Sequence, residues 1–570
     1  MKKCKWMALL MTSVLVIGML SACGGNTSGN NTGTTNNAGS TSATAGTAQT
    51  SDEGSAATAP VKENVGGLEL PLTDEKKELE VFMDWSSTVL ENPNESKGTQ
   101  MMEERTNVHI NWQTYSQSEM IEKFNIVLTT GEYPDIMFPA GTNSYPGGYL
   151  QGIEDGVLVD MDQYMQYMPN YMAKLNSSPD ALAQAAYDDG KFHGVRVIRG
   201  TNSEVKGPGA VFGPTYRSDL LEKMGEELPR TIQGWHDLLV KCRDNGMSAP
   251  MTLESDGGTA LSLAWGINTD WSSNYWQYDY ETDTVQYAPL LDGFDEWLQT
   301  MAQWYQEGLI DKNFTAGSAI ITKDYSNIET DQTMLFDIWF GFMNGSFLYD
   351  SGFVTNPNCY LQAFDGVVLN EGDEVIKCVG DACIAQEIFV TTKTEDPVLA
   401  AKWLDYQYST EGIQYRYYGI EGESYTIDSN GVYQYTDAII NDPKGLTPSE
   451  ALASYALGSY MGYQNDEAGD ILTIQSSADG RSATVESVAL WASPEKTIHM
   501  PNGPSLNLEE QEITSTYMTD ITTVVQEHMV KTIIGEDHTS HADFVAKLKQ
   551  YHIDDCIKCW QDACDRFNNR

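Results

Sequence analysis

Apolar and polar residues follow a strand–helix–strand rhythm in the first part of the chain. Residues 79–83 and 108–112 have the pattern of strands, and residues 135–138 form the short apolar run of a buried strand. Residues 96–106 and 118–130, which lie between these strands, are rich in helix formers. This alternation predicts an α/β lobe with a mainly parallel sheet, in which ligands lie beyond the carboxyl ends of the strands.

A second α/β stretch follows, and helices then continue to the C-terminus. A strand is expected near Thr215, and residues 234–245 and 292–308 are predicted helices. Residues 396–409 form a further predicted helix with Pro397 in its first turn. No internal repeat is visible, and 570 residues exceed the roughly 250–300 at which a single core stops growing. Two α/β lobes and a helical C-terminal region are therefore expected.

The first 22 residues have the pattern of an export signal. Lysines precede an apolar run, residues 6–19, which is shorter than the about 20 residues of a membrane span. The sequence Leu20-Ser21-Ala22-Cys23 follows and resembles the bacterial lipobox. This resemblance implies that Cys23 is lipidated and becomes the first residue of the mature protein. The alternative is a small-residue cleavage site that contains a cysteine by chance.

Low-complexity sequence follows the export signal. Residues 24–59 consist mostly of Gly, Asn, Thr, Ser and Ala, which cannot bury enough apolar area to fold. Residues 23–70 are therefore interpreted as the lipidated cysteine and a flexible tether, in which the roughly 35 low-complexity residues span on the order of 30–35 Å. The expected location is the extracytoplasmic face of the cell membrane, with the protein held by its lipid anchor.

The charge balance excludes one class of partner. The chain has 34 basic and 81 acidic residues, which gives a formal net charge of −47. Nucleic acid is not expected as a partner, because phosphate contacts need clustered Lys and Arg. A hydrophobic content of 41% with 13 Trp, 30 Tyr and 16 Phe excludes a largely disordered chain. The simplest interpretation of the acidity is a soluble surface that works outside the cell.

The cysteines are better explained as packing residues than as disulfide-forming, redox or metal-binding groups. Seven of them remain after the export segment, and an odd number excludes a complete disulfide framework within one chain. Cys556, Cys559 and Cys564 resemble a metal or redox cluster. Apolar residues at helical spacing over 544–567 instead favour these cysteines as packing residues, with a disulfide and then a metal site as the alternatives.

No cofactor is expected, although two acidic turns leave a structural calcium ion as an alternative. Residues 428–431 and 279–283 contain part of a calcium-loop pattern but lack its later carboxylates. Hairpin turns explain both segments better. His538 and His541 flank a short turn and are interpreted as surface residues.

Five segments together carry a family resemblance. They are Thr130 to Ile136, Leu228 to Thr231 with Trp235, Trp304 to Asp311, Tyr418 to Glu423, and the tail Leu548 to Arg566. In this order they resemble the family 1 extracellular solute-binding proteins of bacterial ABC sugar importers, in particular the large lipoprotein branch. The resemblance implies a two-lobed, periplasmic-binding-protein-like α/β fold with crossing segments between the lobes and hinge closure around a ligand.

The resemblance also implies lobes that are discontinuous in sequence. Lobe 1 is expected at 71–205 and about 388–420, and lobe 2 at about 206–387 and 421–570. The crossing segments then lie at these boundaries, and the helical C-terminal region belongs to lobe 2.

Sugar binding calls for a specific mixture of side chains. Aromatic rings stack on the apolar faces of pyranoses, and polar groups orient the rim of hydroxyls. Such residues are expected in loops at strand ends and in Trp clusters that fit no helix face. The candidate ligand-binding residues are Asp84, Trp85, Ser86, Asn143, Ser144, Arg217, Trp265, Trp271, Trp276, Trp339, Phe340, Tyr418, Glu421 and Glu423.

Each group of candidates has an alternative structural role. For Trp85 it is a cap on the core, and for Arg217 a salt bridge. One or two of the three Trp residues at 265–276 are expected in the core. Residues 143–144 alternatively form a plain loop, and the motif at 418–423 alternatively shapes a turn that its glycines permit.

These observations predict a solute-binding protein that is not an enzyme. The expected ligand is a carbohydrate, most simply an oligosaccharide, which a membrane-anchored monomer delivers to the permease subunits of an ABC importer. The alternatives are a peptide or other solute receptor of the same fold and, less favoured, a secreted glycosidase. The chain lacks G-x-S-x-G, H-E-x-x-H, P-loop and G-x-G-x-x-G motifs. Few Lys or Arg in the candidate loops disfavours a uronate ligand.

Overall fold

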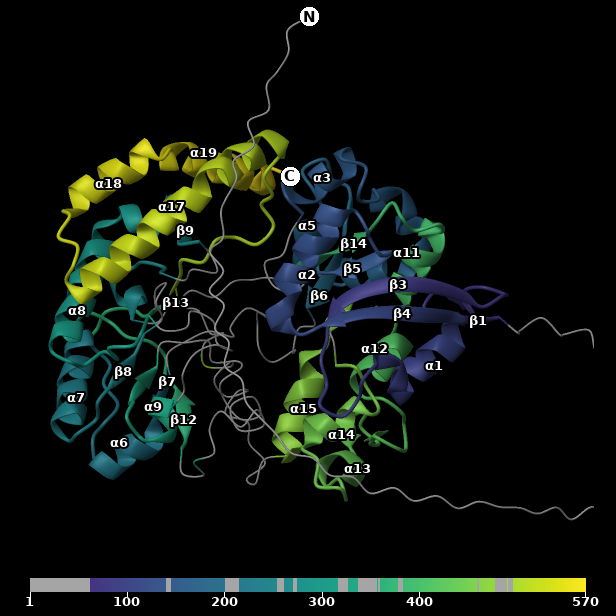
Figure 1. Ribbon diagram of the computed structural model, residues 1–570, viewed down its shortest axis with the longest axis horizontal. Helices are drawn as coiled ribbons and strands as arrows, with labels where there is room; N and C mark the ends of the chain where they lie inside the picture. Colours follow the sequence, from purple (N-terminus) through teal and green to yellow (C-terminus); the bar gives the residue numbers. More distant parts are fainter. Residues whose placement is uncertain are drawn as a thin grey trace, which may run out of the picture. The chain divides into compact units, whose positions relative to one another are not determined.

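The computed structural model describes residues 62–139, 145–199, 215–253, 261–269, 274–315, 326–336, 356, 359–377, 383–458, 461–476, 490 and 496–570. Figure 1 shows two main sheets in this part of the chain, each with its own helices. The predicted signal peptide, Cys23 and residues 24–61 of the predicted tether lie outside the described residues, as do the candidates Asn143, Ser144, Trp271, Trp339 and Phe340. Residues 62–70, which the sequence analysis assigned to the flexible tether, instead form a hairpin in which Leu68 and Leu70 are buried.

The first sheet has six strands, five of which run in one direction. In spatial order they are β17 (Tyr463–Gln464), β6 (Val195–Arg199), β14 (Ile384–Val390), β5 (Ile136–Phe138), β3 (Lys77–Asp84) and β4 (Val108–Tyr115). β3 is parallel to β4 and β5, and β17 is parallel to β6, whereas β14 is antiparallel to both β5 and β6. The carboxyl ends of five strands therefore share one edge of the sheet, which we call the carboxyl edge.

Both faces of the first sheet are buried, as is typical of parallel sheets. Val81 and Met83 belong to one hydrophobic core, while Phe82 belongs to a second core, because successive side chains point to opposite faces. The helices that belong with this sheet are α1 (Lys97–Thr106), α2 (Gln117–Thr130), α3 (Gly148–Glu154), α4 (Pro169–Asn176), α5 (Pro179–Ala185), α11 (Pro397–Tyr406) and α12 (Thr410–Tyr417). A short hairpin, β1 (Glu63–Val65) and β2 (Leu68–Leu70), precedes them.

Capping residues set the bounds of α2 at the carboxyl edge. Ser116 and Glu119 form a capping box at its start, and Gly131, in the left-handed conformation, ends it. The connection from β4 into α2 is therefore the single residue Ser116. The predicted strands in this region are confirmed as β3, β4 and β5.

A small tyrosine-rich unit follows α12 and packs with the first sheet. Its elements are β15 (Tyr425–Ile427), β16 (Tyr433–Tyr435), α13 (Asp437–Ile440), α14 (Pro448–Ala453) and α15 (Asp466–Ser476). Its core joins Ile413 of α12 to Tyr418, Tyr425 and Tyr435. The chain then pairs β17 with β6. The structure therefore places residues up to 476 with the first sheet, whereas the sequence prediction assigned everything after 420 to the second lobe.

The second sheet has four short strands and a core rich in tryptophan. Its strands are β12 (Leu361–Ala363), β7 (Thr215–Arg217), β11 (Leu335–Phe336) and β8 (Met251–Thr252), in that order. Trp235, Trp297 and Trp304 lie fully buried in its core. The other elements here are α6 (Ser218–Met224), α7 (Ile232–Asp244), β9 (Trp276–Asp279), β10 (Thr284–Tyr287), α8 (Asp292–Gln306), α9 (Ser326–Glu329), β13 (Ile376–Lys377) and β18 (Lys496–Thr497).

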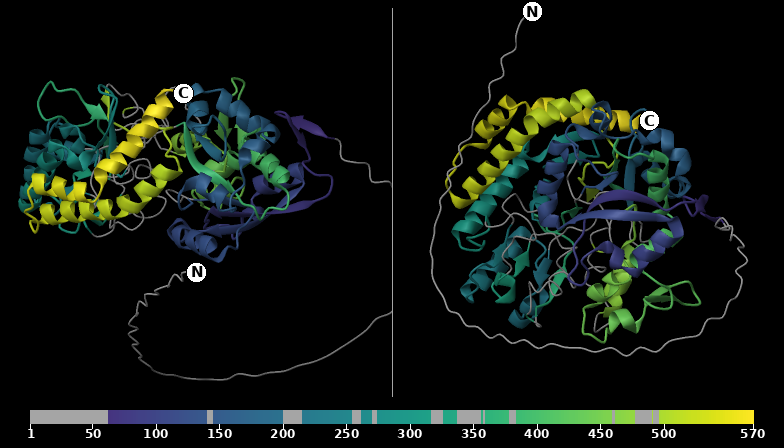
Figure 2. Two further views of the ribbon diagram at one scale, coloured as in Figure 1. Left: turned by 90° about the horizontal axis from the view of Figure 1, so that it is seen from above. Right: turned by 45° about the vertical axis from the view of Figure 1, so that its right-hand side comes forward.

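Three C-terminal helices complete the second core, as predicted. They are α17 (Leu508–Ile534), α18 (His541–Gln550) and α19 (Ile553–Asn568). α17 packs against both α8 and α19 (Figure 2). Phe544 of α18 stacks on Phe294 of α8, with ring centroids 6.1 Å apart. The last part of the sequence therefore supplies side chains to a core that was begun some 250 residues earlier.

The chain passes between the two sheets three times. β6 ends at Arg199 and β7 begins at Thr215, close to the first predicted crossing. The second passage lies between β13 and β14, and a third, which the sequence did not predict, lies between α15 and β18. Both lobes are therefore discontinuous in sequence.

Candidate functional site

The carboxyl edge of the first sheet brings together residues that are distant in sequence. Asp84 and Trp85 stand at the end of β3, Arg199 at the end of β6, and Asn465 directly after β17. The strand-end position of Asp84 and Trp85 is the one that the sequence predicted. Because ligands of open α/β sheets bind beyond this edge, these residues form the candidate site.

The end of β3 is held in place by local hydrogen bonds. The N–H of Trp85 donates to the carbonyl of Tyr115 at 2.9 Å, and the hydroxyl of Ser87 accepts from the N–H groups of Val89 and Leu90. Trp85 is half-buried against the first core, while Ser86 is exposed. Burial raises the pKa of Asp84 above its usual value. The fixed backbone thus places a carboxyl group, a ring and a hydroxyl at three consecutive positions of this strand end.

The other end of the edge contains polar residues that the sequence analysis missed. Gln464 of β17 stands opposite Arg199 of β6 in the ladder, and the Asn465 side chain donates to the Tyr418 hydroxyl at 3.3 Å. β17 is only two residues long, so it has no readable periodicity. The one available signal was the polar run from Gln464 to Glu467 directly after Tyr463.

The two described tryptophans of the predicted Trp cluster have different environments. Trp276 is 5% exposed, with its ring centroid 4.9 Å from that of Tyr287 and 6.3 Å from that of Trp560. Trp265 is half-buried at the edge of the same core. Trp276 is therefore a core residue, and Trp265 keeps a free surface.

Arg217 is fully buried in an ion-pair network. Its guanidinium donates to Asp219 at 2.6 and 2.8 Å, to Asp331 at 2.6 Å and to the carbonyl of Ile328 at 2.9 Å. Three nitrogen atoms of the guanidinium are engaged in this way. The arrangement matches the salt bridge named as the alternative for this residue.

The motif at 418–423 shapes the tyrosine-rich unit. Tyr418 is 2% exposed and stacks on Tyr433 with ring centroids 4.2 Å apart. Glu421 and Glu423 are exposed, and Glu423 forms an ion pair with Lys97. The described residues therefore give this motif a role in packing and in the turn.

The predicted turn and the cysteine helix are both present. Asp428 accepts hydrogen bonds from the N–H groups of Asn430 and Val432 at 2.8 and 3.0 Å, as in a hairpin turn. In α19 the three thiols are free and buried, and burial raises the pKa of Cys556 and Cys564 to about 12. Within the described ranges, no three His, Cys, Asp or Glu side chains are grouped to hold a metal.

Comparison with known proteins gives the family. Residues 94–414 match the family described as bacterial extracellular solute-binding protein. This chain belongs to that family. The resemblance seen in the sequence is therefore confirmed, and so is the extracytoplasmic class of the protein.

Similarity to individual relatives extends over nearly the whole chain. The fructooligosaccharide ABC transporter substrate-binding protein FusA of Streptococcus pneumoniae serotype 4 is 23% identical over 534 residues, 88% of this chain and 92% of the relative. A solved structure of the alginate-binding protein AlgQ2 has a TM-score of 0.67 at 20% identity, covering 87% of this chain and 99% of that one. An HMO binding solute-binding protein from Bifidobacterium longum infantis has a TM-score of 0.66 at 15% identity, with coverage of 86% and 99%. The predicted two-lobed solute-binding fold is confirmed.

Proposed function

We propose that this protein binds an oligosaccharide outside the cytoplasm and delivers it to an ABC importer without chemical change. One structural observation supports a sugar site: the carboxyl edge of the first sheet presents Asp84 and Trp85 at one end and Asn465 at the other. The similarity to FusA, a fructooligosaccharide substrate-binding protein, extends over 88% of the chain and supports the same ligand class. The family is one of binding proteins, which is why no reaction is proposed.

The geometry suggests how a sugar is held. Trp85 offers a ring face for stacking, and Asp84, Ser86 and Asn465 offer hydrogen-bonding groups for hydroxyls. Trp265 is the described candidate of the second lobe with ring surface to contribute. Arg217, Trp276 and Tyr418 are not included, because their side chains are committed to internal contacts. Closure of the two lobes around the ligand is part of the proposal.

Anchoring and partners are also part of the proposal. Cys23 carries the lipid, the low-complexity tether separates the folded lobes from the membrane, and the permease of the importer receives the ligand from a monomer. Among helices in the described ranges, none has the length and apolarity of a membrane span. Incorporation of labelled fatty acid into the wild type, and its loss in Cys23→Ser, tests the anchor.

The direct test is ligand binding by the soluble protein that begins at residue 24. Neutral and acidic oligosaccharides are compared by thermal unfolding, because a ligand at 100 times its Kd adds about 2.7 kcal/mol to stability. We expect a shift of a few degrees with one glycan class and the glycan recovered intact after overnight incubation. Cleavage of the glycan would instead identify a glycosidase. No shift with any glycan, together with a shift on adding peptides, would identify a peptide receptor.

A further inference from the structure

The candidate ligand residues Trp85 and Ser86 begin a loop that the tyrosine-rich unit holds from outside. The loop runs from Trp85 to Ser96, between β3 and α1. Thr88, an exposed residue of this loop, donates from its hydroxyl to the Glu450 carboxylate of α14 at 2.9 Å. In the described part of the chain, this is the one hydrogen bond that joins residues 86–91 to another element. It therefore fixes the part of the loop that directly follows Trp85.

Glu450 is itself held in place at the start of its own helix. Its second carboxylate oxygen accepts from the N–H and from the hydroxyl of Thr447, both at 3.0 Å, in the capping box of α14. The first oxygen is the one that Thr88 contacts. One carboxylate thus caps a helix with one oxygen and holds the loop with the other. The position of the loop is therefore set by a helix and not by an unsupported side chain.

The start of α1, where the loop ends, is also closed by residues of the tyrosine-rich unit. A helix leaves its first N–H groups without partners in the helix, and a side chain at the N-cap usually supplies one. Within the described residues, the N-cap Ser96 makes no such side-chain bond. Instead, the N–H of Lys97 donates to the carbonyl of Ser454 at 3.1 Å, and that of Gly98 to the carbonyl of Tyr455 at 2.9 Å. The first turn of α1 therefore depends on backbone that follows α14.

A glycine makes this close approach possible. Gly98 is buried, and a Cβ added to it would lie 2.2 Å from the carbonyl oxygen of Tyr415 and 2.6 Å from that of Tyr455. Both oxygens belong to packed backbone, which cannot move aside as the end of a flexible side chain can. A larger residue at position 98 would therefore push α1 away from α12 and from the segment after α14.

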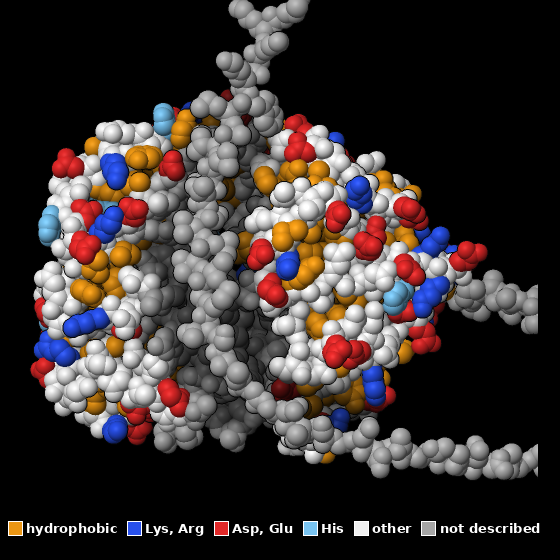
Figure 3. All heavy atoms as spheres, viewed as in Figure 1, with side chains coloured by type: hydrophobic (Ala, Val, Ile, Leu, Met, Phe, Trp, Pro, Cys, Tyr) orange, Lys and Arg blue, Asp and Glu red, His pale blue; other side chains and the backbone are white. Residues whose placement is uncertain are grey.

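The exposed ion pair of Lys97 with Glu423 adds little to these contacts. On the face shown in Figure 3, Lys and Arg side chains lie scattered among Asp and Glu, so a pair of this kind is ordinary for the surface. Exposed pairs are weak because water and salt screen them. The attachment of the loop therefore rests on the backbone contacts of α1 and on the hydrogen bond of Thr88.

The same unit reaches the other end of the candidate site. Asn465 follows β17 and precedes α15, and its side chain donates to the Tyr418 hydroxyl at 3.3 Å. Tyr418 in turn stacks on Tyr433 of β16. β3 and β17 are four strand positions apart, a distance of about 19 Å at roughly 4.8 Å per strand. The tyrosine-rich unit therefore contacts both ends of the carboxyl edge.

We propose that the tyrosine-rich unit positions the sugar site, and that Thr88 and Glu450 are positioning residues that hold Trp85 and Ser86 in the arrangement that binds ligand. A loop that is fixed before binding loses less conformational freedom when the ligand arrives, so affinity rises without a new contact. Neither Thr88 nor Glu450 has to touch the sugar. The inference rests on the proposed oligosaccharide function and assigns the tyrosine-rich unit a part in it.

The first experiment removes the hydroxyl of Thr88 and keeps the shape of the side chain. The probe is the one glycan of the neutral and acidic panel that shifts the melting of the wild type most. We expect Thr88→Val to weaken its binding about three- to tenfold by calorimetry, and Thr88→Ser, which keeps the hydroxyl, to bind within about twofold of the wild type. Both should melt like the wild type, because residue 88 is exposed. Wild-type affinity in Thr88→Val would overturn the inference.

A double-mutant cycle separates positioning from direct contact with the sugar. We expect Glu450→Ala to weaken binding to a similar extent, and the double variant Thr88→Val/Glu450→Ala to lose about as much as one single variant, because both break one contact. If the two fold-losses multiply instead, the side chains act independently and the inference is wrong.

Hydrogen exchange of the ligand-free protein gives a readout that does not depend on the probe. The amides of residues 86–91 should exchange about three- to tenfold faster in Thr88→Val than in the wild type, and at the wild-type rate in Thr88→Ser. Equal exchange in all three proteins would show that the contact does not hold the loop, which would overturn the inference.

The contact at the start of α1 is tested with two glycine substitutions. Gly98→Ala should weaken binding at least about tenfold and lower the melting temperature, because the added Cβ meets backbone. Gly469→Ala, on α15 of the same unit, should change neither, because nothing lies within 4 Å of its added Cβ. Equal affinity of these two variants would overturn the inference. Silence of the wild type to every glycan would overturn the proposed function as well, whereas a wild type that binds no better than Thr88→Val overturns this inference alone.

Discussion

At the scale of single residues, the buried Asp405 makes the stability of the fold depend on pH. It is 0% exposed, and two hydrogen bonds from Asn170 and Tyr171 do not compensate its desolvation, so burial raises its pKa to about 6. The unfolded chain has an Asp pKa near 3.9. The folded state therefore holds this proton more tightly, and the resulting stability is present below about pH 4 and lost as the pH rises through about 6.

Asp405→Asn should remove this pH dependence. We expect the unfolding free energy of the wild type, relative to that of the variant, to fall by up to about 3 kcal/mol between about pH 4 and pH 7. Urea unfolding followed by Trp fluorescence measures it. Asp396→Asn, at the exposed N-cap of the same helix, is the control, because asparagine also caps a helix. A difference that stays constant with pH would mean that Asp405 titrates normally.

Trp85 is the residue for which a binding prediction is sharpest. Trp85→Ala should weaken binding of the identified glycan by at least about tenfold, since a stacking tryptophan at a binding site typically acts as a hot spot. Trp276→Ala is the contrast: it should lower stability by about 3–5 kcal/mol and leave the affinity of the folded fraction unchanged. Titration calorimetry with a parallel melting curve separates the two. A Trp85→Ala protein that binds normally would place the sugar elsewhere.

The sequence could locate Asp84 and Trp85 because they directly follow a clearly periodic strand. The sequence could not show that Arg217 and Trp276 are buried and not in contact with ligand. Their burial depends on residues far away in sequence, such as Asp331 and Trp560. Arg199 gave no local signal at all.

At the scale of elements, β17 is a strand that the pattern of apolar and polar residues could not predict. β3 and β4, with eight residues each, were predictable, whereas β17 has two and depends on neighbours. The carbonyl of Gly462 accepts a hydrogen bond from the N–H of Ile198 at 2.9 Å, and the guanidinium of Arg416 donates to the carbonyl of Tyr463. These two contacts set the position of β17. The lobe boundary after residue 420 was misplaced for the same reason, because this short pairing returns the chain to the first sheet.

Gly462→Ala should disturb β17 specifically. Gly462 has a φ of +91°, and an added Cβ would lie 2.9 Å from the Gln407 side chain and 3.4 Å from that of Arg416. We expect a loss of stability of about 1–3 kcal/mol together with weaker ligand binding. Gly431→Ala, at φ +83° with open space around it, should cost about 1 kcal/mol and leave binding intact. Equal behaviour of the two variants in urea unfolding and calorimetry would show that β17 does not position the site.

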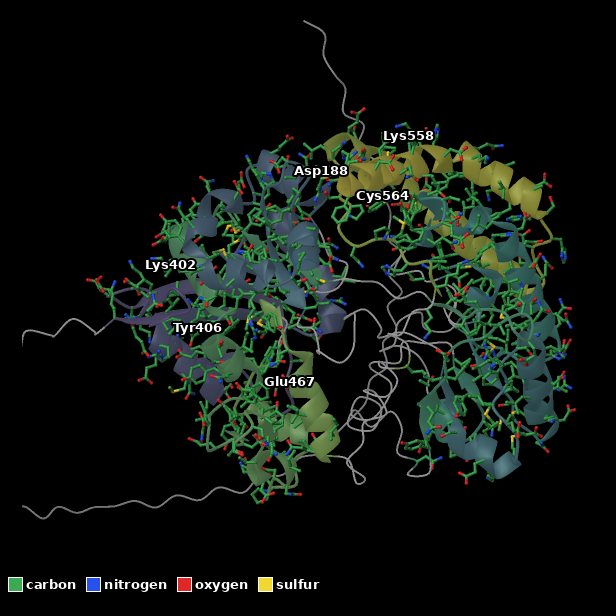
Figure 4. All side chains as sticks on the ribbon, turned by 180° about the vertical axis from the view of Figure 1, so that it is seen from behind. Asp188, Lys402, Tyr406, Glu467, Lys558 and Cys564 are labelled. Atoms are coloured by element: carbon green, nitrogen blue, oxygen red, sulfur yellow. The ribbon has the colours of Figure 1, made fainter. Side chains whose placement is uncertain are left out.

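At the scale of the whole molecule, the C-terminus connects parts that carry separate cores. Asp188, which follows α5 of the first lobe, accepts from Arg566 of α19 at 2.7 Å and forms an ion pair with Arg570. Arg566 also donates to Glu510 of α17 at 2.6 Å. Figure 4 shows Asp188 beside the end of α19. The two-lobed architecture could be predicted from the sequence, but this ion cluster could not, because it joins residues some 380 positions apart.

Asp188→Asn should therefore weaken the mechanical coupling of the two lobes. Each lobe has its own sheet and core, so a single unfolding transition requires contacts that make them unfold together. We expect one calorimetric transition in the wild type and a split or broadened one in Asp188→Asn, with a loss of about 1–2 kcal/mol in the less stable lobe. Asp189→Asn is the matched control, because its partner is His193 of the same lobe. If both variants unfold alike, the ion pairs of Asp188 contribute no coupling, and cooperativity must come from the crossing segments and from other contacts between the lobes, such as that of α17 with α3.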